Sequence, residues 1–117
     1  MATDLEWDRT GRSIVNDHGQ LEYRFGPGAT CEIVNIEVNE DHRQQGTGRS
    51  MLEALFGECK PRGIGSVYAI SRADNMPAQE FYEKTLFRYS GVLRRFYNPK
   101  GKGVDAVIYA RSPEGPV

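Results

Sequence analysis

The segment Arg43-Gln44-Gln45-Gly46-Thr47-Gly48-Arg49 lies between a predicted strand and a predicted helix, and the rest of the fold is arranged around it. Gly46 and Gly48 lack side chains, so the backbone can turn sharply and approach a ligand closely. The free N–H groups at the start of the following helix favour an anion there. Arg43 and Arg49 add charge and forked donors suited to phosphate. The segment predicts a phosphate-binding turn, and the alternative is a plain strand-to-helix connector.

Two better-known phosphate loops do not fit this segment. A Walker loop requires Gly-x4-Gly-Lys-Ser/Thr, which the sequence lacks. The dinucleotide fingerprint requires a third glycine three residues after Gly48, and that residue is Met51.

Strands and helices follow one another on both sides of the turn. Helical spacing of apolar residues is clearest directly after it, at Met51, Leu52, Leu55, Phe56 and Cys59. Pro61 and Gly63 are predicted to end this helix. A second helix begins near Asn75 and has Pro77 in its first turn; its predicted buried face carries Ala78, Phe81, Tyr82, Thr85 and Leu86. The predicted strands are Ser13–Asn16, Gln20–Phe25, Cys31–Asn39, Ser66–Ser71, Phe87–Tyr97 and Val104–Arg111. The order β-β-β-α-β-α-β-β predicts one α/β (α+β) domain over residues 1–117, with a mixed, mostly antiparallel sheet flanked by helices.

Composition narrows the function classes. The chain has 117 residues, a net charge of −1 and a sequence pI of about 6.1, which argues against a dedicated nucleic-acid or membrane binder. It has neither a signal-peptide pattern nor an apolar run long enough for a membrane span. Cys31 and Cys59 are predicted to be buried thiols in a reducing compartment, which indicates a cytoplasmic protein, and no metal-ligand cluster is evident.

Several spaced motifs in a fixed order resemble the GNAT superfamily of acetyl-CoA-dependent N-acyltransferases. They are the strand Glu32–Val38, the Arg-x-x-Gly-x-Gly turn from Arg43, and Asn-x-x-Ala-x-x-Phe-Tyr from Asn75 to Tyr82. The tail, through Leu86-Phe87 and residues 91–97, is most similar to the bacterial ribosomal-protein N-terminal acetyltransferases.

The resemblance implies acetyl-CoA as cosubstrate and assigns its contacts by position. The backbone of Ile36, Glu37 and Val38 would pair with the pantetheine arm. The N–H groups of Gln44, Gln45, Gly46, Thr47, Gly48 and Arg49 would hold the pyrophosphate, and Asn75 would contact the cofactor. The sequence departs from the ribosomal-type enzymes in two places, with Ile70 where they carry a glutamate and Asn98 where they carry a second tyrosine.

Glu32 is the first candidate for the base that deprotonates the amine. Strand alternation predicts that it heads an otherwise apolar face with Val34, Ile36 and Val38, and the resemblance matches it to the base glutamate of the histone-acetylating branch. Glu37, on the opposite predicted face, is the alternative base. Tyr82 is the candidate acid for the leaving thiolate, because a phenol stays protonated at neutral pH. The plain alternatives are a solvated strand-end charge for Glu32 and a core aromatic for Tyr82.

The sequence therefore predicts direct acetyl transfer to a primary amine, which is a peptide N-terminus, a lysine or a small amine. Tyr97 and the basic group Arg94, Arg95, Lys100 and Lys102 are candidates to line the acceptor site and favour an acidic peptide; the alternative is a solvated hairpin. A catalytically inactive acyl-CoA-binding or partner-binding module is the alternative function. The family's two usual N-terminal helices have no room before the first strand, which predicts a homodimer that covers the open sheet face.

Overall fold

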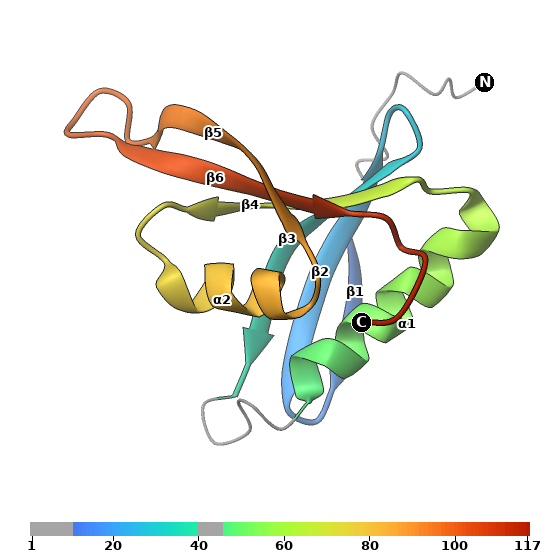
Figure 1. Cartoon of the computed structure of the whole chain (residues 1–117). Coiled ribbons are helices and arrows are strands. Elements are labelled where there is room, and N and C mark those ends of the chain that lie inside the picture. The colour runs from blue at the N-terminus through green and yellow to red at the C-terminus, as the bar shows by residue number, and fades with distance from the viewer. Residues whose placement is uncertain (1–10, 40–45) are drawn as a thin grey trace. The chain divides into compact units, whose positions relative to one another are not determined.

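The computed structural model describes residues 11–39 and 46–117, which form two compact units. Val67 and the described residues before it, together with Ser112–Val117, make the first unit, and Tyr68–Arg111 make the second (Figure 1). The order of elements is the predicted β-β-β-α-β-α-β-β, and the strands pair mostly antiparallel, so the predicted fold class is confirmed. No helix in the described ranges is long and apolar enough to cross a membrane.

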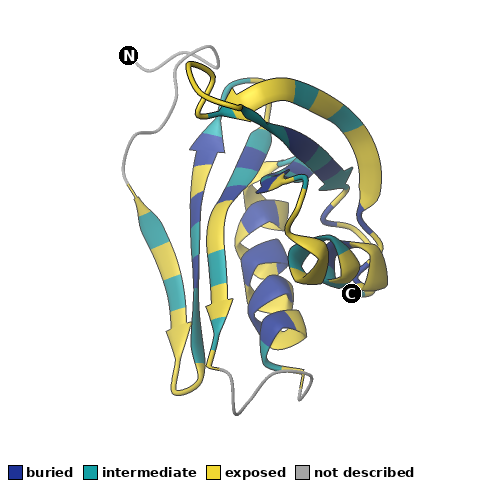
Figure 2. Cartoon of the chain, turned by 90° about the vertical axis from the view of Figure 1, so that its left-hand side faces the viewer, coloured by how far each residue is buried: buried dark blue, intermediate teal, exposed yellow. Residues whose placement is uncertain are grey.

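The first unit is an antiparallel meander covered by one helix. Its strands are β1 (Arg12–Asn16), β2 (Gly19–Gly26) and β3 (Thr30–Val38), and its helix is α1 (Thr47–Cys59). Strict alternation on β2 buries Leu21, Tyr23 and Phe25 on the inward face. Figure 2 shows the buried side of α1 turned toward these strands, and the predicted helical stripe is the one that is buried: Met51, Leu52, Leu55, Phe56 and Cys59.

The end of α1 is defined by local sequence. The α-helix stops at Cys59 and tightens into one 3-10 turn, Lys60–Arg62, which contains Pro61. Gly63 then adopts the left-handed conformation, with φ of 69°, and its N–H donates to the Lys60 carbonyl at 3.0 Å. Pro61 and Gly63 therefore end the helix as the sequence predicts.

The second unit contains most of β4 (Ser66–Arg72), α2 (Met76–Lys84), β5 (Arg88–Tyr97) and β6 (Val104–Arg111). β6 lies between β4 and β5, so β5 is the last strand in the order. Tyr82 anchors α2 on this layer. Its ring lies 5.2 Å from the Phe87 ring and stacks on Tyr109 at 6.0 Å between centroids.

Leu86 does not lie on the buried face predicted for the second helix. It is 57% exposed, because the chain leaves α2 with Leu86 in the left-handed conformation at φ of 69°. The N–H of Phe87 then donates to the Tyr82 carbonyl at 2.9 Å, and the Phe87 ring occupies the buried position instead.

Candidate functional site

The start of α1, from Gly46, has the geometry of an anion-binding helix start. Gly46 is the N-cap residue, with φ of 83° and ψ of 4°, a left-handed conformation that glycine adopts without steric cost. Gly46 has no side chain to cap the helix, no residue in the described ranges supplies a capping side chain, and no acidic residue occupies the first turn. The first intrahelical bond comes from the Ser50 N–H to the Gly46 carbonyl, at 2.9 Å, so the N–H groups of residues 47–49 have no partner within the helix.

The remaining predicted phosphate ligands are placed only in part. Arg43, Gln44 and Gln45 lie outside the described residues. Gly48 is buried in the first turn of α1, and Arg49 is exposed beside it. The Arg49 guanidinium donates through Nη1 to the carbonyl oxygen of Val117, within the same unit.

The prediction that Glu32, Val34, Ile36 and Val38 share one face of β3 is wrong, because the strand contains a β-bulge. Tyr23 pairs with Ile33 and Glu22 pairs with Asn35, so Val34 is an extra residue without a cross-strand partner on β2. The bulge shifts the side-chain phase, because Cys31 and Ile33 are buried before it whereas Ile36 and Val38 are the more buried residues after it. Glu32 and Val34 therefore do not share a face with Ile36 and Val38.

The same bulge places Glu32 and Glu37 on one outward face, although alternation predicts opposite faces for them. Glu32 lies opposite Arg24 in the register and accepts hydrogen bonds at Oε1 from Arg24 Nη2 at 2.7 Å and from Nε at 2.8 Å. Its side chain is only 12% exposed. Glu37 is exposed and accepts a bond from Asn35 Nδ2 at 3.1 Å. Sequence analysis missed Arg24, which counting back across the β2–β3 turn would have found.

Tyr82 is a buried phenol in an aromatic cluster. It is 4% exposed and is surrounded by the rings of Phe81, Phe87 and Tyr109. Burial raises its pKa above the usual range, so the hydroxyl stays protonated at neutral pH. These contacts agree with a core role and, equally, with a proton donor held in one orientation.

Asn75 is the N-cap of α2 and lies where the chain passes from β4 into α2. We call residues 72–79 the corner, and polar contacts hold it in place. Its Oδ1 accepts a hydrogen bond from the Ala78 N–H at 3.2 Å, as an N-cap residue does. Arg72 holds Asp74 through two hydrogen bonds, of 3.0 and 3.1 Å, and these lower the pKa of the Asp74 carboxyl. Gln79 Nε2 donates to the Ala73 carbonyl at 2.9 Å and closes the corner.

The second unit brings Tyr97 to this corner. The Arg72 guanidinium lies 5.4 Å from the centre of the Tyr97 ring, at a distance typical of a cation–π contact. The corner is also joined to β6 through Asp105, whose carbonyl accepts a hydrogen bond from the Ala73 N–H at 2.8 Å. Tyr97 and Asn75, 22 positions apart in the sequence, are thus tied to one corner of the fold. No sequence signal identifies Arg72 as the link between them.

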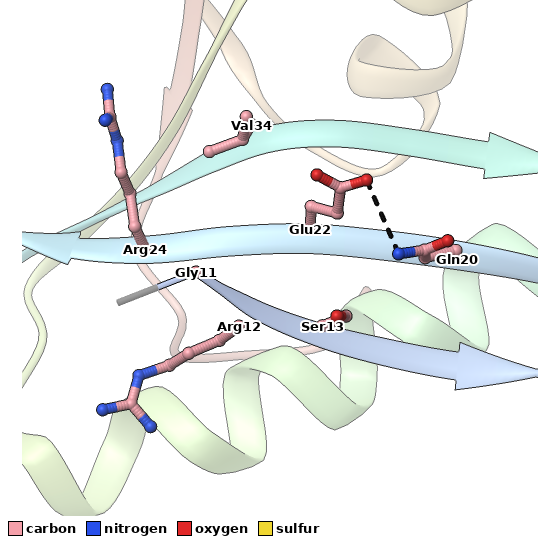
Figure 3. A pocket seen from close by; sticks show the side chains of 7 residues that line it. All are labelled: Gly11, Arg12, Ser13, Gln20, Glu22, Arg24 and Val34. Carbon is pink, nitrogen blue, oxygen red and sulfur yellow. Dashed lines mark hydrogen bonds between the residues drawn. The ribbon is translucent and has the colours of Figure 1, made fainter. Parts of the chain in front are cut away.

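A polar depression of about 500 Å³ lies on the outward face of the meander. Figure 3 shows the Arg12 and Arg24 side chains extending away from each other, and a hydrogen bond of 3.5 Å between Gln20 and Glu22. The residues that line it are Gly11, Arg12, Ser13, Gln20, Glu22, Arg24 and Val34. None of these is a sequence-predicted site residue. Within the described ranges, no three His, Cys, Asp or Glu side chains are grouped to hold a metal.

The fold and the turn together define an α/β protein that presents an uncapped, glycine-initiated helix start. Residues 10–86 match the acetyltransferase (GNAT) family, and the chain belongs to this family.

Similar proteins carry N-acetyltransferase names. The ribosomal protein bS18-alanine N-acetyltransferase of Escherichia coli K12 is 35% identical over 78 residues, which are 67% of this chain and 53% of that protein. N-alpha-acetyltransferase 60 of Drosophila melanogaster is 35% identical over 97% of this chain and 42% of its own length. The chain thus spans about half the length of the curated relatives it matches.

Solved structures confirm the fold. The crystal structure of the ribosomal-protein-S18-alanine N-acetyltransferase from Escherichia coli has a TM-score of 0.70 at 24% identity and covers 93% of this chain and 73% of that one. A putative streptothricin acetyltransferase from Bacillus anthracis, solved with acetyl coenzyme A, has a TM-score of 0.76 at 19% identity and covers 81% of this chain and 55% of that one.

Proposed function

We propose that this protein is an acetyl-CoA-dependent N-acetyltransferase whose acceptor is a primary amine of a peptide N-terminus, a lysine or a small molecule. The observation that carries the proposal is the start of α1, where left-handed Gly46 leads into backbone N–H groups that no side chain in the described part of the chain caps. Family membership gives that helix start a ligand, the pyrophosphate of acetyl-CoA.

The remaining cofactor contacts are assigned to the motif residues. The backbone of Ile36, Glu37 and Val38 pairs with the pantetheine arm, and Asn75 contacts the cofactor from the start of α2. Arg43 and the N–H groups from Gln44 to Arg49 hold the phosphates. Acetyl-CoA is consumed as a cosubstrate, and the residues assigned to the chemistry use no metal.

The transfer is direct. A base removes a proton from the ammonium form of the acceptor, and the neutral amine attacks the thioester carbonyl. The C–N bond forms, the C–S bond breaks, and CoA leaves as a thiolate that takes a proton from the Tyr82 phenol. The nitrogen loses its second proton to solvent as the amide forms, and a proton from solvent restores the phenol. Glu32 is our assigned base. Glu37 competes for this role because the bulge places both carboxylates on one face.

Thr47 offers the sharpest test of the cofactor turn. Thr47→Glu puts a carboxylate into the first turn of α1, where the helix dipole favours it, so the fold is retained. The same carboxylate repels pyrophosphate. Calorimetric titration should therefore show acetyl-CoA binding lost in Thr47→Glu and kept in Thr47→Gln. Gly48→Glu is a second variant, although its buried position adds a risk to folding. Equal affinity in Thr47→Glu and Thr47→Gln would remove the turn from the proposal.

Kinetics separate the two chemical roles. Tyr82→Phe keeps the ring packing and removes the proton, so kcat should fall by about 10²-fold or more while acetyl-CoA affinity holds. Glu32→Gln should also lower kcat, with a loss that shrinks at high pH, where the amine is deprotonated by the solvent. Glu37→Gln is the matched control. If its loss has this pH dependence and that of Glu32→Gln does not, Glu37 is the base.

A catalytically inactive acyl-CoA-binding or partner-binding module is the second candidate. Ile70 and Asn98 favour it, since the ribosomal-type enzymes carry acid–base groups at these positions, and so does the engagement of Glu32 by Arg24. Release of free CoA with any member of an amine panel identifies an enzyme. Acetyl-CoA binding without CoA release across the panel identifies the module.

We also propose that the protein is a homodimer of the cytoplasm. The outward face of the meander exposes Val15 at 68% and Val34 at 51%, apolar surface that a second copy would cover. Free, buried Cys31 and Cys59 fit a reducing compartment. Light scattering at micromolar concentration should show twice the 13.2 kDa of one chain, and a monomer there would refute the dimer.

A further inference from the structure

Positive charge is concentrated in the β5–β6 hairpin, which we define as residues 88–104. This segment contains five cationic residues and no aspartate or glutamate, although the whole chain has a net charge of −1. The one acidic residue of β6, Asp105, directly follows the segment, and its Oδ1 accepts a hydrogen bond from the Arg95 backbone N–H at 2.8 Å. Arg95 is used internally, because its Nη2 donates to the Pro99 and Gly101 carbonyls at 2.9 Å each and so shapes the loop. The other four, Arg88, Arg94, Lys100 and Lys102, are exposed and contact no carboxylate in the described ranges.

Three of these cations lie on β5 and two lie in the loop after it, and β5 is an edge strand among the strands that the structure describes. β5 is the last strand in the order, and seven of its ten residues are exposed, whereas β6 beside it has none. Large apolar side chains are exposed along it, with Tyr89 at 56%, Val92 at 43% and Phe96 at 50%. An edge strand presents unpaired main-chain groups that an extended peptide can use.

The positive charge of the hairpin distinguishes between three possible binding partners of the β5 edge: a second copy of the chain, a nucleic acid and an acidic peptide. A second copy would bring two cationic hairpins together, and like charges across paired strands are destabilising. A nucleic acid requires a broad basic footprint, whereas the rest of this chain is acidic and would repel a long polyanion. A short acidic segment meets the cations alone, and its backbone can use the edge.

We propose that the β5–β6 hairpin binds an extended acidic peptide segment of a partner protein. The carboxylates of the segment pair with Arg88, Arg94, Lys100 and Lys102, and its backbone lies along β5 near Gly91–Leu93, where pairing with β6 is regular. This surface is a binding site in its own right, so it does not depend on acetyl transfer.

The test uses a fluorescein-labelled decapeptide of alternating glutamate and threonine, with a glutamine–threonine peptide as its neutral counterpart. Fluorescence anisotropy at low salt and without acetyl-CoA should show the glutamate peptide binding at least about tenfold more tightly than the glutamine one. Lys100→Glu/Lys102→Glu should weaken binding by about tenfold, the factor expected when exposed attractive pairs become repulsive. Lys60→Glu/Lys84→Glu makes the same change in charge elsewhere on exposed residues and should leave affinity within about twofold.

Backbone methylation tests the strand pairing. N-methyl groups on the odd residues of the peptide block one of its edges, and those on the even residues block the other. One of the two methylated peptides should lose binding and the other should keep it.

Three results would overturn the proposal. Equal losses in the two lysine double variants would mean that only net charge matters. Tighter binding of a ten-nucleotide oligothymidylate, lost in Lys100→Glu/Lys102→Glu, would assign the hairpin to nucleic acid. Self-association that Phe96→Ser abolishes and the glutamate peptide does not displace would assign the edge to a second copy.

Discussion

Replacing Gly46 by alanine separates the conformation of the turn from its function. Gly46 has φ of 83°, and an added Cβ would meet nothing within 4 Å, so the substitution changes backbone preference alone. The left-handed conformation costs an alanine roughly 1–2 kcal/mol, and the stiffer unfolded chain returns about 0.4–1 kcal/mol. The free energy of unfolding should therefore fall by about 1 kcal/mol, a shift of about 0.5 M in the urea midpoint.

Gly63 provides the matched control at the other end of the same helix. It has φ of 69° and an equally open Cβ position, so Gly63→Ala should cost the same stability. Only Gly46→Ala re-aims the N–H groups that we assign to pyrophosphate. Losing one hydrogen bond to a charged group costs about 1.5–3 kcal/mol, which predicts a roughly ten- to hundredfold weaker acetyl-CoA affinity for Gly46→Ala alone.

The assays are urea unfolding and calorimetric titration with acetyl-CoA, run on both variants and the wild type. Unchanged urea midpoints in both variants would refute the conformational argument. Equal acetyl-CoA affinities in the two variants would refute the placement of the cofactor at this turn, whatever their stabilities.

Three further predictions concern stability and reactivity. Leu86→Gly should raise the free energy of unfolding, measured in urea, by roughly 0.5–1 kcal/mol, because Leu86 is 57% exposed and strained at positive φ. Asn98→Gly should gain less, since asparagine tolerates that conformation. A loss of stability in Leu86→Gly would refute the strain. Burial raises the pKa of Tyr82, so its contribution to stability is complete below about pH 10 and falls above it by up to about 1.4 kcal/mol per pH unit; urea unfolding of Tyr82→Phe should show a shallower alkaline fall, and parallel curves would contradict this. Cys31 and Cys59 are both 0% exposed, so a thiol-reactive dye should label neither until urea unfolds the chain; rapid labelling of the native protein would refute their burial.

The sequence predicts those features that depend on local pattern. The apolar stripe of α1 is buried as predicted, because it follows from the period of the helix itself. The predicted strand Gln20–Phe25 is also found, within β2. The stops at Pro61 and Gly63 are equally local.

The features missed by sequence analysis depend on pairing between elements. Nothing within β3 marks Val34 as an extra residue, because the bulge exists only against β2, and the side-chain faces of Glu32 and Ile36 follow from it. Leu86 was misplaced because a leucine occupies a helix-ending conformation that glycine usually takes. For the candidate site, the sequence identifies the turn, but not the Arg24 partner of Glu32 or the link from Arg72 to Tyr97.

The bulge at Val34 adds one residue to β3 and so shifts by one position which side chains face the core. Downstream of it, side chains at even positions turn inward, whereas upstream the odd positions do. Deleting Val34 would remove the bulge and restore plain alternation, with Ile36 and Val38 still facing the core and Asn35 and Glu37 still facing outward. Pairing β3 regularly with Val34 retained would instead drive Asn35 and Glu37 toward the core and expel Ile36 and Val38. A sequence alignment that slips by one residue within β3 makes the same exchange of faces, because it compares solvent-facing residues with core residues over the whole second half of the strand. Substitutions in this strand are therefore best transferred between relatives by counting from the bulge and not from either end.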